Sequence, residues 1–264
     1  MKKNTAIRTI HIILWSLLSV VWISTGISLL LRSAIRQAVE TSSDTLVQMI
    51  DTNQIITAIL FAAGTYIGEI HSLLLPSTSK NDVDRTILPI VFFFFSLLYI
   101  PTLVGYLQVN SLYIFPLALF GKIYIGSAFY SFVLLVLTGI YSVGINASKM
   151  YQHIIVTAVI SLFIVSLIPV NSALYPLEYL RWTSSTLFIS VISVLTALSV
   201  FTIWSVNKKE STQYSLLRSI RLTLIQIGAA GYILTPHSRI NYLCIALYLA
   251  GIGLGFYRDR FSQL

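Results

Sequence analysis

The sequence is a succession of apolar stretches, most of them about 20 residues long, separated by short polar segments. An α-helix rises 1.5 Å per residue, so about 20 apolar residues match the roughly 30 Å hydrocarbon layer of a bilayer. This length criterion predicts an all-α polytopic integral membrane protein with about eight spans. Six lie near residues 9–31, 54–75, 87–108, 123–145, 154–174 and 183–205, and two shorter ones near 220–235 and 240–257.

The composition excludes a soluble domain of any size. Of the 264 residues, 56% are hydrophobic and only 10% are charged, and the mean hydropathy is +0.83. A soluble domain carries roughly 25% charged residues, so this chain cannot build a water-facing surface. The spans also leave no room for a separate catalytic domain. The single cysteine, Cys244, excludes a disulfide framework within the chain and a cysteine-based metal cluster.

The net charge of +8 is better explained by membrane orientation than by nucleic acid, because the basic residues are scattered along the chain. With the N-terminus inside, twelve of the seventeen Lys and Arg residues fall in cytoplasmic segments. We therefore expect the N-terminus and the C-terminus on the cytoplasmic side. The first apolar run is longer than a signal-peptide core and ends without a small-residue cleavage pattern, which indicates a retained first span.

Two organisational units are expected. Residues 1–210 hold the six longer spans, and residues 211–264 hold a basic cytoplasmic segment followed by a two-helix hairpin. The segment 206–221 is the most basic in the chain and is interpreted as a surface helix held by anionic lipid headgroups. Residues 33–52 have the pattern of an amphipathic helix on the outer surface.

Ionisable residues inside membrane spans are expensive and mark functional sites by default. Glu69 is the only acidic residue within any predicted span, and it lies close to the cytoplasmic end of that span. His71 follows two residues later and therefore faces away from Glu69 on a helix. With no further carboxylate deep in a span, a proton relay and an intramembrane hydrolase are both unsupported.

No enzymatic motif is present. The chain has no His-Glu-x-x-His motif, no Walker A motif and no recognisable serine–histidine spacing. The Gly-x-Gly-x-Gly run at Gly251, Gly253 and Gly255 lies inside an apolar stretch rather than after a strand. The pairs Gly64/Gly68 and Gly251/Gly255 are each four residues apart, which is typical of closely packed helices.

The order of several motifs resembles the permease subunit of type-2 ABC transporters over about residues 9–210. Glu69 is followed by Leu73-Leu74-Leu75-Pro76, then Ser77 or Ser79, then Arg85, which is similar to that family's cytoplasmic helix at the end of span two. The run Pro176-Leu177-Glu178-Tyr179-Leu180 is similar to the external re-entrant element before its sixth span. Ile70 departs from the family's pattern, in which a second charged residue is usual, and the last two spans exceed its six-span core.

The resemblance implies a role for two groups of residues. The contact with a partner ATPase would consist of Glu69, His71, Leu75, Pro76, Ser77 and Arg85. The external re-entrant element would contain Pro176, Glu178, Tyr179 and Arg181.

The resulting expectation is a non-enzymatic permease subunit in the cytoplasmic (inner) membrane of a bacterium, exporting an apolar or amphipathic substrate. It would bind no cofactor or metal itself, because ATP and magnesium would be held by a separate cytoplasmic ATP-binding subunit. Its other partners would be a second permease copy or a sister permease, and membrane lipids. The alternative is a non-transporting membrane scaffold or sensor that binds a partner through its loops. A co-purifying ATPase would favour the permease, and a retained partner without ATPase activity would favour the scaffold. An integral membrane enzyme is the third alternative, and it would turn over a lipid alone.

Overall fold

The computed structural model describes residues 52–74, 82–99, 115–142, 149–167, 186–210, 213–235 and 240–261. Within these ranges the chain is all-helical and contains no strand, so the predicted helical class is confirmed there. The elements are α2 (Thr52–Leu74), α3 (Asp82–Ser96), the 3₁₀ turn η2 (Leu97–Tyr99), α5 (Phe115–Ser142), α6 (Met150–Leu167), α8 (Thr186–Glu210), α9 (Gln213–Leu234) and α10 (Ile240–Phe261).

Five of the described helices are long and apolar enough to cross a membrane. These segments are Ile56–Leu74, Gly121–Ser142, Met150–Leu167, Thr186–Ser205 and Ile240–Tyr257. The chain is therefore a membrane-embedded protein. Helix α3 has only 15 residues, and the arginines and glutamines of α9 lower its mean hydropathy, so neither is among the five. The total of eight spans and the orientation stay predictions, and the predicted span 9–31 and the amphipathic segment 33–52 lie outside the described residues.

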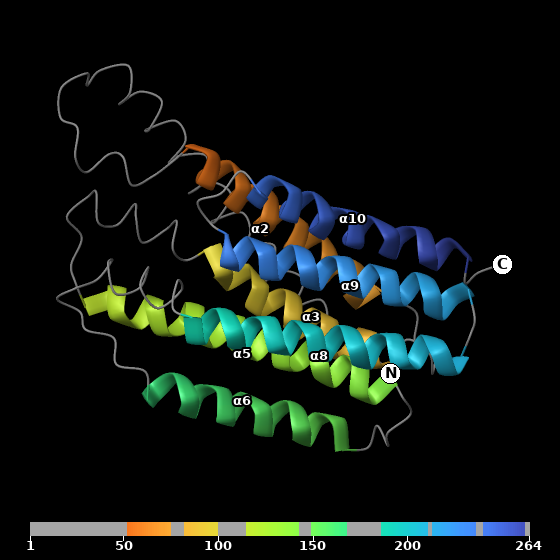
Figure 1. The fold of residues 1–264 in the computed structure, drawn as a ribbon, viewed down its shortest axis with the longest axis horizontal. Coiled ribbons are helices and arrows are strands. Elements are labelled where there is room, and N and C mark those ends of the chain that lie inside the picture. The colour runs from red at the N-terminus through yellow and green to blue at the C-terminus, as the bar shows by residue number, and fades with distance from the viewer. Residues whose placement is uncertain are drawn as a thin grey trace, which may run out of the picture.

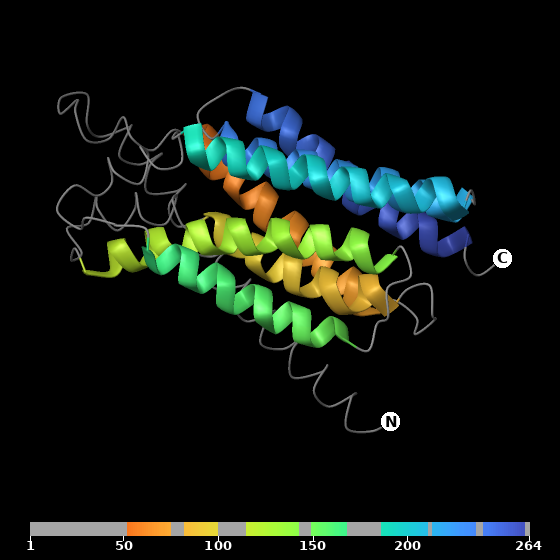
Figure 2. The same cartoon turned by 60° about the horizontal axis from the view of Figure 1, so that its bottom comes forward.

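Six helices form a closed ring in the order α2, α3, α5, α8, α9, α10, with α10 returning to α2. Helix α6 lies outside this ring and packs on α5, as Figures 1 and 2 show from two directions. The helices run along the long axis, and successive ones point in opposite directions (Figure 1). The end at the right of Figure 1 therefore collects the last residues of α2, α5, α8 and α10 and the first residues of α3, α6 and α9. We call it the polar end, for the side chains described below.

Glycines let these helices approach closely. A Cβ added to Gly228 of α9 would lie 2.6 Å from the Cys244 carbonyl oxygen and the Tyr248 nitrogen of α10, and one at Gly251 would lie 2.9 Å from the Arg221 carbonyl oxygen. On α2, a Cβ at Gly68 would lie 2.6 Å from the Phe92 ring. Since only a hydrogen fits at these points, the predicted close packing at Gly64/Gly68 and Gly251/Gly255 is confirmed.

An aromatic cluster fills the ring away from the polar end. Its members come from five of the six ring helices: Phe61 (α2), Phe95 (α3), Phe132 (α5), Tyr232 (α9) and Tyr248 (α10). The Phe61 ring stacks on Tyr232 with centroids 4.2 Å apart and on Tyr248 at 4.6 Å, and Phe95 meets Phe132 at 5.8 Å. These separations lie within or just below the usual range for favourable aromatic pairs.

The outer face of α6 and α8 is apolar. Helix α6 buries a single stripe against α5, made of Met150, Ile154, Ser161 and Val165. Its remaining large side chains, such as Val159 and Phe163, are exposed, as are Leu187 and Phe201 of α8. A surface of this kind suits contact with hydrocarbon chains.

Candidate functional site

The buried charged side chains that the structure describes gather at the polar end of the ring, with His71 and Ser72 beside them. They are Glu69, His71 and Ser72 near the end of α2, Asp84 at the start of α3, and Arg218 and Arg221 near the start of α9. Burying a charged group away from water is costly unless a partner compensates it. The contacts of these side chains therefore define the candidate site.

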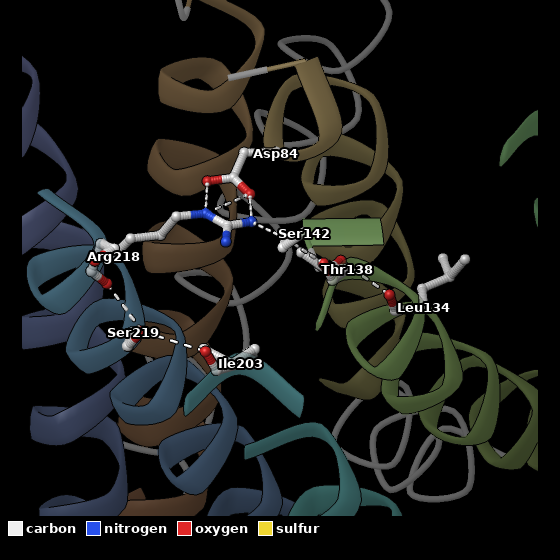
Figure 3. Close-up of polar contacts among 8 residues, drawn as sticks. Asp84, Leu134, Thr138, Ser142, Ile203, Arg218 and Ser219 are labelled. Carbon is white, nitrogen blue, oxygen red and sulfur yellow. Dashed lines mark hydrogen bonds and ion pairs between the residues drawn. The ribbon is translucent and has the colours of Figure 1, made fainter. Parts of the chain in front are cut away.

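The centre of the site is an ion pair between Asp84 and Arg218 (Figure 3). Asp84 is 0% exposed. The Arg218 Nε donates to Oδ2 at 2.9 Å and to Oδ1 at 3.1 Å, and Nη2 also donates to Oδ1. This is the forked geometry in which guanidinium and carboxylate interact most strongly. Asp84 lies in the first turn of α3, where the helix dipole also favours a negative charge.

The ion pair extends to a third helix through Ser142, the last residue of α5. Arg218 Nη2 donates to the Ser142 Oγ at 2.6 Å, and this hydroxyl donates onward to the Thr138 carbonyl oxygen at 2.5 Å. The Thr138 hydroxyl in turn donates to the Leu134 carbonyl oxygen at 2.9 Å. One guanidinium thus joins the ends of α3, α5 and α9. We call the contact among Asp84, Ser142 and Arg218 the three-helix node.

Arg221 forms a second buried contact one turn further along α9. Its Nη2 lies 3.4 Å from the His71 Nδ1, and a Cβ added at Gly255 would lie 2.9 Å from its Cζ. The His71 ring also packs against Phe256, with centroids 4.2 Å apart. The contact therefore joins α2, α9 and α10, and the glycine at 255 leaves the space that the guanidinium occupies.

The predicted contact residues divide between buried and partly exposed positions. Glu69 is 3% exposed, His71 is also buried, and Arg85 is half-buried. His71 lies against Arg221 and Phe256, whereas Glu69 leaves α2 about 160° away from it, as their spacing requires. The other predicted residues lie outside the described ranges: Leu75, Pro76, Ser77, Pro176, Glu178, Tyr179 and Arg181.

The interpretation of 206–221 as a surface helix is wrong for its two arginines. Arg218 and Arg221 are buried in the ring, and α9 begins at Gln213 rather than near 220. The two arginines were counted as cytoplasmic loop charges, but their spacing of three places both on one helical face among apolar residues. This spacing, in a stretch with the composition of a helix, is the sequence feature from which the burial of both arginines could have been predicted.

Sequence reasoning also missed Asp84. The predicted span began at residue 87, whereas α3 begins at Asp82, so Asp84 was assigned to a loop. An aspartate in the first turn is typical of a helix start. Nothing local, however, indicates that its partner lies 134 residues away on α9.

Besides the bond from Lys122 Nζ to the Ser166 carbonyl oxygen at 3.4 Å, two polar contacts attach helix α6 to α5. The Tyr141 hydroxyl and the His153 Nδ1 form a hydrogen bond near the polar end. The Tyr130 hydroxyl donates to the Ile154 carbonyl oxygen at 3.0 Å. Both contacts lie on the α5–α6 interface and outside the ring interior.

In the part of the chain that the structure describes, no three His, Cys, Asp or Glu side chains come together as a metal site would require. Comparison with protein-family models, with curated proteins and with solved structures gives no match. Fold and site together therefore define a class only. The chain is a membrane-embedded protein that is all-helical in its described ranges and has a buried arginine–aspartate node at one end of a helical ring.

Proposed function

We propose that the chain is the membrane permease subunit of an ATP-driven exporter and that a separate cytoplasmic ATPase binds at its polar end. The observation that carries this proposal is the concentration of buried charge at that end. Charged groups inside membrane helices are rare, and they mark substrate or ion pathways and voltage-sensing helices. In the predicted orientation the polar end faces the cytoplasm, where an ATPase would bind.

The energy for transport would come from the partner, because the ring carries its buried charges at one end and is otherwise largely apolar. ATP-driven closure of the partner would push on the end of α2 and the start of α3. That movement would shift the start of α3 relative to α9, so the ring would pass between two packings. An apolar interior of this kind suits an apolar or amphipathic substrate.

The contact surface itself would use exposed side chains next to the predicted motif. Leu74, the last residue of α2, is 68% exposed, and Arg85 is half-buried. Glu69 and His71 are both buried, so they would hold the end of α2 in place rather than touch the partner. Leu75, Pro76 and Ser77 would complete the contact.

The test is purification of the chain from its native membrane in mild detergent, with mass spectrometry of the bound proteins. We expect a Walker-type ATPase in the complex and ATP hydrolysis by it. Leu74→Glu should release the ATPase. Leu187→Glu is the matched control, because Leu187 is 66% exposed but lies at the opposite end of the ring. A complex without an ATPase would contradict the proposal.

The scaffold alternative also has a specific observation in its favour. The aromatic cluster packs Phe61 against Tyr232 and Tyr248 in the middle of the ring, which suits a rigid structural element. A scaffold would retain a partner with no ATPase, and vesicles containing the purified complex would show no ATP-dependent movement of a fluorescent amphipathic dye.

A further inference from the structure

We propose that the three-helix node is a latch, which holds the polar end of the ring closed and must release when that end opens. This inference rests on the proposed function, since it describes the moving part of the same permease. The node is formed by Asp84, Ser142 and Arg218, and each of these residues lies within a few residues of an end of its helix.

The geometry concentrates the contact among α3, α5 and α9 in one side chain. Arg218 reaches Asp84 of α3 through Nε and Nη2, and Nη2 also reaches Ser142 of α5. Withdrawal of this guanidinium would therefore free α3 and α5 from α9 together. A contact made by several independent side chains could not release in one step.

The position of the node favours hinge-like opening. Because the three residues lie within the first two turns or the last turn of their helices, these ends can separate while the hydrogen bonds of the remaining turns stay intact. The same three helices are held further along by the aromatic cluster, through Phe95, Phe132 and Tyr232. Opening would thus move the helix ends apart at the polar end, with the aromatic cluster as the pivot, and the packing in the cluster would stay intact.

The energetics of a buried ion pair fit a two-state contact. Each buried charge is compensated by its partner, but removal of one partner leaves the other charge uncompensated in a poorly solvated site, which is unfavourable. Once the polar end admits water, both groups can be hydrated instead. Closed and open states are therefore both compatible with Asp84 and Arg218, whereas a half-broken node is not.

Two buried serines provide matched reporters for this motion. Ser72 lies at the polar end of α2, and Ser131 lies eleven residues, about 16 Å, before Ser142 along α5. Both are fully buried, and each donates its hydroxyl to the carbonyl oxygen four residues earlier in its own helix. Cys244→Ser removes the single cysteine of the chain. In that background, Ser72→Cys and Ser131→Cys are labelled with a water-soluble maleimide on the purified full chain in lipid vesicles.

The latch predicts slow labelling at both reporters while the node is intact. Asp84→Asn should speed labelling at the residue-72 reporter by about tenfold or more, because it strands Arg218 and favours the open end. The residue-131 reporter should be unchanged. Exchange of the charges, Asp84→Arg with Arg218→Asp, should return the residue-72 reporter toward its slow rate.

Two outcomes would overturn the latch: equal acceleration of both reporters, which means general loosening, or no acceleration of either. If Asp84→Asn does not fold, Arg218→Lys replaces it. That variant keeps the charge but replaces the forked guanidinium with a single ammonium nitrogen, so the separate Nε contacts to Asp84 are lost. An intermediate rate at the residue-72 reporter is therefore expected. Failure of the proposed function looks different, since no ATPase would co-purify while the difference between reporters persists.

Discussion

The polar end and the aromatic cluster close the same ring by opposite means. At the polar end, one guanidinium connects three helices through directional bonds to Asp84 and Ser142. In the aromatic cluster, Phe61 contacts rings from three other helices, and none of these contacts depends on charge. Directional contacts are lost together when one atom group moves, whereas aromatic packing weakens gradually. The contrast indicates that the polar end is the part of the ring that changes conformation and that the aromatic cluster is the part that stays packed.

The largest effect is expected from Asp84→Ala. This change removes the carboxylate that compensates the buried Arg218 charge. It should lower the free energy of unfolding by about 3–5 kcal/mol. The measurement is denaturation in detergent micelles followed by circular dichroism. The double variant Asp84→Ala with Arg218→Met should recover much of the loss, because it removes both charges. If the double variant is as unstable as the sum of the two single variants, the polar end is not held by a coupled pair.

Next in size is Gly255→Ala, which tests the Arg221 contact. The added Cβ would lie 2.9 Å from the Arg221 Cζ and 3.0 Å from the His71 Cε1, and overpacking of this kind costs about 1–3 kcal/mol. Gly253→Ala is the control on the same helix, since no atom lies within 4 Å of its added Cβ. That variant should be neutral or slightly stabilised. Similar losses from both substitutions would indicate a general effect on α10.

A smaller loss is expected from Phe61→Leu in the aromatic cluster. Leucine retains much of the buried volume, so the cost should be about 1–2 kcal/mol, including the lost ring stacking. Phe201→Leu is the control, because Phe201 is highly exposed on α8 and should tolerate the change. The variant in the cluster should not alter maleimide labelling at residue 72. If it did, the cluster would not be an independent pivot.

The sequence predicted the helical class, the positions of most described helices and the glycine contacts, because these depend on local composition and spacing. It failed at the three-helix node, because a pairing between residues 84 and 218 is a property of the ring and leaves no local trace. Arg218 and Arg221 were assigned to a lipid surface by the usual behaviour of basic residues near spans. The ring buries them instead, since partners on α2 and α3 are brought within reach. In the sequence Glu69 is the isolated acid of a predicted span. Asp84, which forms the ion pair with Arg218, falls in a predicted loop.

The smallest expected effect is that of Ser142→Ala, and it separates the node from the simple ion pair. Loss of the hydroxyl removes the α5 contact but leaves Arg218 on Asp84, so the cost should be about 1 kcal/mol, as for one hydrogen bond. Ser131→Ala is the matched control, because its hydroxyl bonds only within α5, and it should cost less. Denaturation of the two variants side by side measures the difference. Equal values would mean that α5 is not part of the closing contact and that only α3 and α9 are joined. A clear difference would establish that the guanidinium holds all three helices.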